Sequence, residues 1–543
     1  MRKVYRIVFI LTGMCVTSLI PQQGHGQHDQ RPELITAYSP SSVIRILESG
    51  QERKSVLTDE AEFKKQKAED FKLLLINARN APPEIAADTL IQLLGVGGIG
   101  DLAIRREMAK EAFNLAYSTQ YRVKMYDVID DADSRNRMLS YGYSLEMDTL
   151  SLQCRSVKEM LAIDKQAARE MFEEIVLPEL PPLSCEGAMV YDVSLYYAVL
   201  ANILKSAYTK EEVEKNARVQ LLSRIMARVS SVAELSPAIK VILGAELQPA
   251  DFGMVVQLIS SRMANLPKDP RAFSSSARAV GGDVRLLAEH CKRLGVSNID
   301  LLGSYRSLLR DNLTSVICKD HEDVGKAAEW VNTRAEAFNS LLADLDPEGK
   351  TRISRLNGAE LTPKSIGAAP KIDAYWKSPM AEKLLAEIGR LNFGQNRKKV
   401  SLAEREQEKW QRELTESVGN LRSWSNHKDE SVSEIDYFHQ KCNLYELLIQ
   451  ITPKSSSQLD GILSDYIGFL SYARSQKESL IEWQWQARVP LLTLGYTKQS
   501  PDSVLKRYTE SGDRLLRLIA EAKLFIAKYK SPNSVIETRR TQQ

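Results

Sequence analysis

Residues 196–213 read YYAVLANILKSAYTKEEV, and this stretch carries both signals from which the fold is predicted. Its apolar side chains recur at the spacing of one helix face: Tyr196, Val199, Leu200, Ile203 and Leu204. Such a stripe is typical of a helix that packs against other helices. Thr209 and Glu212 then form a capping box, which marks the start of a second helix after a short break. The stretch therefore predicts two helices joined by a tight turn.

The same pattern recurs far from this stretch. Two further apolar stripes have helical spacing: Phe252, Val255, Val256, Ile259 and Met263, and near the end Leu515, Leu518, Ile519, Ala522, Ile526 and Tyr529. Ser401 and Glu404 form a second capping box, and the pairs Ser236-Pro237 and Ser500-Pro501 resemble helix starts. Residues 121–130 are the best strand candidate.

Short breaks between helices favour antiparallel neighbours. We therefore predict an all-α protein built as an array of antiparallel helical hairpins. The array is either α-solenoid-like or a set of irregular bundles, and a division into two helical domains is one arrangement it can take.

A composition shift suggests where the division lies. All six tryptophans occur at or after Trp330, and residues 346–371 are rich in Pro, Gly, Ser and Thr, as linkers often are. The predicted organisation is a signal peptide at 1–26, a flexible segment at 27–40, an N-terminal helical array at 41–345, a linker at 346–371, a C-terminal helical domain at 372–530 and a disordered tail at 531–543.

The first residues resemble an export signal. Arg2, Lys3 and Arg6 precede the uncharged, mostly apolar residues 7–20, and the small residues Gly24 and Gly26 predict cleavage between Gly26 and Gln27. The alternative is an uncleaved N-terminal anchor. Cleavage predicts a periplasmic or extracellular product.

The charge balance argues against nucleic acid as a partner. The chain holds 73 basic and 70 acidic residues, and the predicted leader contains three of the basic ones and no acidic one. The cleaved chain would therefore have no net charge, whereas phosphate binding demands a basic surface. No stretch after the leader is long and apolar enough to predict a membrane span.

Five cysteines follow the leader, and an oxidising compartment permits disulfides. The disulfide candidates are Cys154, Cys185, Cys291 and Cys318, because the spacings 154/185 and 291/318 suit bridges between neighbouring helices. Connectivity is left open by the sequence, and the odd number leaves at least one thiol over, so Cys442 is either free or paired.

Four segments resemble a group of large, exported, helical proteins of soil bacteria. They are PPEIAADTLI at Pro82–Ile91, SLQCRSVKEMLAID at Ser151–Asp164, LPPLSCE at Leu180–Glu186 and DYFHQKC at Asp436–Cys442. The resemblance spans most of the chain after the leader. It implies an all-α fold and no known activity, so it assigns no catalytic residue.

Two patterns suggest cofactors, and each has a simpler explanation. Residues 95–100 match the G-x-G-x-x-G of dinucleotide sites, but the preceding segment is predicted as a helix, so a turn between helices is favoured. His290, Cys291, Cys318 and His321 could together form a zinc site, although a disulfide is the simpler expectation. No cofactor is therefore predicted.

Two further patterns suggest activity. Asp436, His439 and Cys442 are the residue types of a thiol nucleophile with its base, but three positions on one helix are poor geometry for it. The candidate ligand-binding residues are Trp376, Trp410, Trp424, Trp483 and Trp485, since tryptophan stacks on sugar rings as well as filling cores.

These observations predict an exported helical scaffold that binds a partner, most simply another protein, in grooves between its hairpins. The alternative is a carbohydrate-active enzyme or sugar-binding protein of α/α type that uses the C-terminal tryptophans. No catalytic residue is assigned by the sequence.

Overall fold

The computed structural model describes residues 50–96, 100–127, 135–183, 189–313, 317–318, 324–350, 352–355, 366–367, 378–394, 398–425, 432–477, 481–491 and 501–529. The predicted signal peptide with its Gly26–Gln27 cleavage site, the flexible segment 27–40 and the tail 531–543 lie outside these residues. So does most of the predicted linker 346–371.

The described chain is built almost entirely of helices, which confirms the all-α class. Before residue 345 these are α2 (Gly50–Arg79), α3 (Pro83–Leu94), α4 (Leu102–Ala116), α5 (Arg135–Tyr143), α6 (Thr149–Leu161), α7 (Lys165–Glu174), α8 (Ser194–Ser206), α9 (Lys210–Glu214), α10 (Ala217–Met226), α11 (Val232–Gly244), α12 (Pro249–Ala264), α13 (Pro270–Leu294), α14 (Ile299–Leu313) and α15 (Val324–Leu342). The opening stretch 196–213 thus holds most of α8 and α9.

The later helices are α16 (Pro379–Asn392), α17 (Leu402–Arg405), α18 (Glu408–Ser423), α19 (Glu434–Ile451), α20 (Ser457–Lys477), α21 (Ile481–Gln486), α23 (Pro501–Glu510) and α24 (Arg514–Tyr529). Four short strands pair in twos: β1 (Met125–Asp127) antiparallel to β2 (Met189–Tyr191), and β3 (Ile317–Cys318) parallel to β4 (Ile366–Gly367). The strand candidate 121–130 therefore contains β1.

Local capping determines where several helices begin. The capping boxes Thr209–Glu212 and Ser401–Glu404 are both formed. The start expected at Ser236-Pro237 is wrong, because α11 begins five residues earlier and Pro237 lies inside it. There Ser231 and Glu234 form a capping box, which satisfies the first backbone N–H groups and makes a second start unnecessary.

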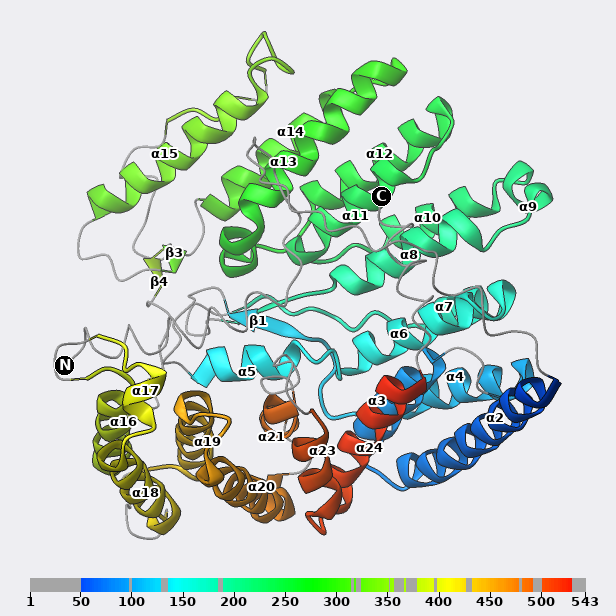
Figure 1. The fold of residues 1–543 in the computed structure, drawn as a ribbon. Coiled ribbons are helices and arrows are strands. Elements are labelled where there is room, and N and C mark those ends of the chain that lie inside the picture. The colour runs from blue at the N-terminus through cyan, green and yellow to red at the C-terminus, as the bar shows by residue number, and fades with distance from the viewer. Residues whose placement is uncertain are drawn as a thin grey trace, which may run out of the picture.

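Between α4 and α15 the helices form two stacked layers (Figure 1). One layer runs α4, α6, α8, α11, α13 and α15, and the other runs α10, α12 and α14, with each helix packed on the next in its own layer. Contacts between alternate helices of the chain arise when helical pairs stack side by side, as in solenoids. Within the described residues, no helix combines the length and apolar character that crossing a bilayer requires.

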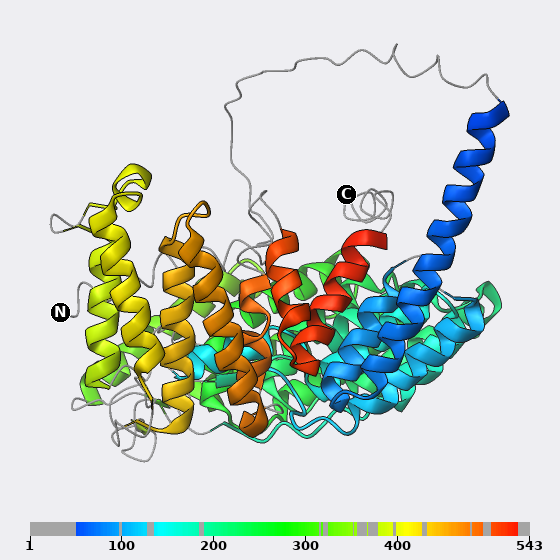
Figure 2. The same cartoon turned by 60° about the horizontal axis from the view of Figure 1, so that its bottom comes forward.

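The C-terminal helices form a second row that returns to the start of the chain. Figure 2 shows α16, α18, α19, α20, α23 and α24 side by side, and α24 packs against α2 and α3. The Tyr529 hydroxyl donates to Asp70 at 2.6 Å, and the rings of Phe71 and Phe525 lie 6.4 Å apart. The last described helix thus packs against the C-terminal half of the first.

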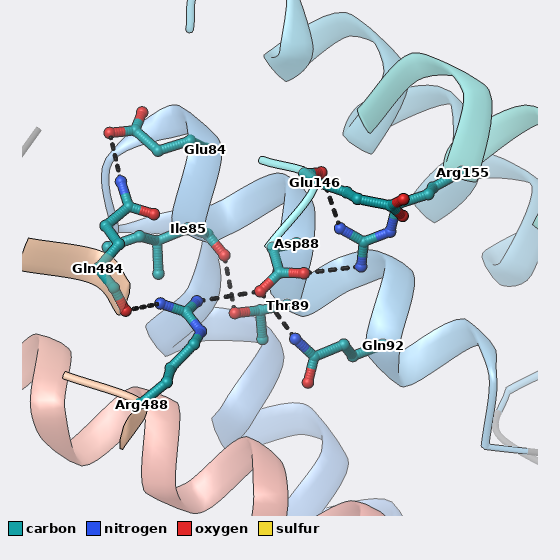
Figure 3. Close-up of polar contacts among 9 residues, drawn as sticks. All are labelled: Glu84, Ile85, Asp88, Thr89, Gln92, Glu146, Arg155, Gln484 and Arg488. Carbon is teal, nitrogen blue, oxygen red and sulfur yellow. Dashed lines mark hydrogen bonds and ion pairs between the residues drawn. The ribbon is translucent and has the colours of Figure 1, made fainter. Parts of the chain in front are cut away.

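A buried polar cluster ties the two rows together at this place, and Figure 3 shows it. Asp88 on α3 accepts from Arg155 on α6 at 2.7 Å, from Arg488 just after α21 at 3.0 Å, and from Gln92 at 2.7 Å. Each arginine also donates to a backbone carbonyl, that of Glu146 or of Gln484. We call Asp88, Arg155 and Arg488 the seam cluster.

Electrostatics keep the seam cluster ionised. Burial alone would raise the pKa of Asp88, but the charges of Arg155 and Arg488 outweigh it and hold that pKa below its usual value. The apolar core is continuous across the seam, since one hydrophobic cluster reaches from Phe71 to Tyr529. The predicted segments 41–345 and 372–530 therefore share a core.

Candidate functional site

The glycine-rich segment at 95–100 follows a helix. Gly95 caps the C-terminus of α3, and Asp101 caps the N-terminus of α4 by accepting from the Ile104 N–H at 2.8 Å. Gly100 has a positive φ of 61°, which glycine adopts without strain. A dinucleotide site needs a strand before the motif, so its described flanks fit a helix-to-helix turn.

Two of the four cysteines expected to form disulfides are buried in the apolar core as free thiols. Cys154 on α6 and Cys291 on α13 are free thiols with no exposed surface, embedded in the apolar core, which differs from the disulfide prediction for both. There a free cysteine packs as a small hydrophobe. Cys185 lies outside the described residues, and Cys318 lies in β3.

The zinc candidates are not brought together in the described structure. His290 lies on α13 with its ring 4.8 Å from that of Phe252, and Arg293 contacts its Nδ1 at 3.0 Å. His321 lies outside the described residues. Among the residues that the structure describes, no group of three or more His, Cys, Asp and Glu side chains is placed to hold a metal.

Asp436, His439 and Cys442 do not form a nucleophile and base. Asp436 sits in the first turn of α19, where Arg135 donates to both of its oxygens at 2.8 Å. His439 and Cys442 are fully buried, and burial raises the pKa of the Cys442 thiol well above its usual value. A protonated, enclosed thiol is a packing group rather than a nucleophile.

Most of the tryptophans also serve as packing residues. Trp410, Trp424, Trp483 and Trp485 are all at least nine-tenths buried, and Trp376 lies outside the described residues. The indoles of Trp410 and Trp483 donate to the carbonyls of Leu391 and Leu470 inside the core. Trp485 stacks on Tyr141 at 5.6 Å. Trp424 alone of these four lines the cleft described next.

That cleft opens between the C-terminal end of α18 and the neighbouring faces of α19 and α20. Its volume is about 350 Å³, and its lining residues are Arg422, Trp424, Ser425, Tyr437, Lys441, Tyr445, Asp465, Phe469 and Tyr472. Five of these nine side chains are aromatic. The volume lies at the small end of the range for ligand sites, which have apolar walls and a few placed polar groups. We call it the aromatic cleft.

The aromatic walls hold one another at fixed angles. The rings of Trp424 and Tyr437 meet edge to face at 4.9 Å, and those of Tyr437 and Phe469 do so at 5.9 Å. Edge-to-face contacts of this kind favour a single arrangement of the rings. At the mouth, Tyr472 is 64% exposed, so its ring presents a large apolar surface to solvent.

Lys441 is the charged group inside the aromatic cleft and is 95% buried, with 5% of its surface exposed. Its Nζ donates to the Trp424 carbonyl at 2.6 Å and to the Tyr437 hydroxyl at 3.1 Å, and it lies 5.2 Å from the centre of the Phe469 ring. Burial lowers the pKa of Lys441 to about 8 and raises that of Tyr437 to about 12. At neutral pH both groups therefore keep their protons.

An ion pair forms the polar rim. Arg422 donates to Asp465 through Nη2 at 2.6 Å and through Nε at 3.0 Å. Two donors on one carboxylate oxygen hold Asp465 in place. The Arg422 side chain is 63% exposed, so it also reaches solvent at the cleft mouth.

Sequence reasoning found one wall of this site and missed the others. Trp424 was among the candidates, but Tyr437, Lys441 and Tyr472 were not. A local signal existed in DYFHQKC, where Tyr437 and Lys441 are four residues apart and so share a helix face. The meeting of α18 with α20 depends on tertiary packing, which no local pattern reveals.

No protein-family model matches the chain, and no match is found among curated proteins or solved structures. The resemblance to exported proteins of soil bacteria stays a prediction. Function is therefore argued from the aromatic cleft alone.

Proposed function

We propose that the protein is a saccharide-binding protein, in which a helical scaffold presents the aromatic cleft as its ligand site. The observation that carries this proposal is a 350 Å³ cleft whose lining combines five aromatic side chains with Lys441, Arg422 and Asp465. Export through a signal peptide at residues 1–26 is part of the proposal, and it would bring the cleft into contact with extracellular or periplasmic saccharides.

The lining matches the two kinds of surface on a sugar ring. A pyranose has an apolar face of C–H groups and a rim of hydroxyls, so it needs flat apolar walls and polar groups around them. The exposed ring of Tyr472 supplies a flat apolar wall at the mouth, and the Arg422–Asp465 pair supplies hydrogen-bonding groups at the rim. The volume suits one or two rings, not a folded protein surface, so the predicted protein partner remains a separate prediction.

The chemistry of the lining supports binding in preference to hydrolysis. Cleavage of a glycosidic bond usually needs two carboxyl groups on either side of the bond. Among the nine described lining residues, Asp465 is the one carboxylate, and Arg422 already holds it. The cleft therefore provides a place for a ring without a described acid and base to act on it.

Titration of the tryptophan fluorescence of the full chain tests this proposal, with a panel of soluble neutral and acidic oligosaccharides as probes. We expect a saturable change with at least one probe, because Trp424 lines the cleft. Tyr472→Ala should weaken that binding about fivefold, since a stacked aromatic contact is worth about 1 kcal/mol.

The matched control is Trp410→Phe, which removes a buried tryptophan outside the cleft lining and should leave both the affinity and the fluorescence change in place. The proposal is wrong if no probe binds to the folded protein. It is also wrong if Tyr472→Ala binds every probe as tightly as the unmodified chain does.

A further inference from the structure

The charges in the aromatic cleft do not balance. Its lining carries two cations, Lys441 and Arg422, and one anion, Asp465. Arg422 and Asp465 form the ion pair at the rim, with Nη2 and Oδ2 2.6 Å apart. One positive charge, that of Lys441, is left inside the cleft.

Lys441 is buried without a counter-ion among the residues that the structure describes. The contacts of its Nζ are a backbone carbonyl, a tyrosine hydroxyl and two aromatic ring faces, all of which are neutral. The charge of Asp465 favours the protonated form of Lys441, but the ion pair of that carboxylate is with Arg422. A buried charge is costly unless an opposite charge pairs with it, so the site gains most from an anion.

The ammonium group of Lys441 has more N–H donors than the two acceptors that it contacts. It carries three N–H bonds, and the Trp424 carbonyl and the Tyr437 hydroxyl accept two of them. Those two acceptors leave the third N–H, and Lys441 is one of the residues that line the cleft. A hydrogen bond from an ammonium to a carboxylate is among the stronger ones in proteins.

We propose that the aromatic cleft binds an acidic saccharide, in which a ring carboxylate, as in a uronic acid, pairs with Lys441 while the ring lies against the aromatic walls. This inference rests on the proposed function and narrows it to one class of saccharide. A cationic ligand would repel Lys441, which already occupies the faces of Tyr437 and Phe469. A neutral sugar would leave the buried charge unpaired.

The test uses the full chain and two probes that differ by one group, trigalacturonate and its methyl ester. A trimer of mannuronate with its ester repeats the comparison on another ring, and a sulfated galactose oligomer tests another anion. We expect at least one uronate to bind about tenfold more tightly than its ester at pH 6.5, because hydrogen bonds to charged groups are the stronger kind.

The pH dependence of binding provides a readout that needs no variant. The affinity for the uronate should fall as the pH rises from 7 to 9.5. Burial, against the smaller opposing effects of Cys442 and Asp465, lowers the pKa of Lys441 to about 8, and the neutral amine cannot pair with a carboxylate. The ester should show a flat profile over the same range. Lys441→Met should reduce the preference for acid over ester to less than about threefold, with folding checked by circular dichroism.

The outcomes separate this inference from the proposed function. If acid and ester bind equally and Tyr472→Ala weakens both, the cleft binds saccharides but the carboxylate assignment is wrong. If the sulfated oligomer alone binds, the uronate assignment is also wrong. If no oligosaccharide binds at all, the proposed function itself fails.

Discussion

The seam cluster and the aromatic cleft both bury charged side chains, yet their bonding differs. At the seam, Asp88 accepts from Arg155, Arg488 and Gln92, and each arginine also donates to a backbone carbonyl. In the cleft, Lys441 lines the wall, and its ammonium group has two neutral hydrogen-bond acceptors.

The difference separates structural charges from binding charges. A buried ion pair with its hydrogen bonds made specifies how two segments meet, although it adds little net stability over apolar packing. A buried charge that has no counter-ion in the protein instead favours the binding of a ligand that supplies the opposite charge. Substituting a charge of the first kind should therefore change the free energy of unfolding, and substituting one of the second kind should change the affinity for a ligand.

The largest effect is expected at the seam. Asp88→Ala leaves the buried Arg488 and the partly buried Arg155 without their carboxylate, and losing one partner of a buried pair costs about 3–5 kcal/mol in the free energy of unfolding. Urea denaturation measures it. Asp344→Ala is the matched control, because it removes a carboxylate whose side chain is 60% exposed from Arg285, and it should cost less than about 1 kcal/mol. Equal costs would contradict the role given to the seam cluster.

A second effect concerns Glu446 on α19, whose Oε1 has no hydrogen-bond partner among the described residues. Burial raises the pKa of Glu446 to about 8, so the folded protein keeps a proton that the unfolded chain releases near pH 4.3. The stability that this proton contributes is complete at acidic pH and is lost as the pH rises through about 8, by up to a few kcal/mol.

Denaturation at pH 5, 6.5 and 8 should show that loss in the unmodified chain, and Glu446→Gln should reduce it, because an amide does not titrate. Glu416→Gln, an exposed change on α18, is the control and should leave the pH dependence intact. Identical slopes for the two variants would show that Glu446 does not hold a proton in the fold.

A smaller effect on stability is expected at Lys441. Lys441→Met removes two hydrogen bonds but also a buried charge without a counter-ion, and these contributions offset each other, so unfolding should change by about 1 kcal/mol or less. The main consequence of Lys441→Met should be that acidic saccharides are no longer bound in preference to their esters. A destabilisation as large as that of Asp88→Ala would place Lys441 with the structural charges.

The smallest effect on stability is expected for Tyr472→Ala. Because the side chain is 64% exposed, unfolding should change by no more than about 0.5 kcal/mol. Thermal unfolding of this variant beside the unmodified chain measures it, and the loss of saccharide binding should then appear in a protein of unchanged stability. A large drop in the unfolding temperature would mean that Tyr472 supports the fold.

Features set by neighbouring residues were predictable from the sequence. The stripe at 196–204 and the capping boxes at Thr209 and Ser401 formed as predicted, because helix periodicity and capping involve residues within a few positions. The start at Ser236 failed for a local reason too, since Ser231 and Glu234 form a capping box five residues earlier.

The features that depend on distant segments were not predictable. The pairing of Asp88 with Arg488 joins residues 400 positions apart, and nothing near either residue indicates the other. The cleft was missed for the same reason, because it forms only where α18, α19 and α20 come together. Trp424 was found because tryptophan is a residue type that binds sugars. Lys441 was missed because lysine usually lies on the surface, whereas this one is buried.

The meeting of α24 with α2 and α3 has a consequence for the order of folding. Asn77 on α2 bonds to Glu521 on α24, 444 residues later in the chain, so α2 and α3 lack this neighbour until almost all of the described chain has emerged. Contacts between such distant segments are slow to form, and apolar surface that waits for them favours aggregation. During synthesis, the packing of α24 on α2 and α3 would therefore be completed late, and a chaperone bound to α3 in the meantime would keep its apolar surface from aggregating.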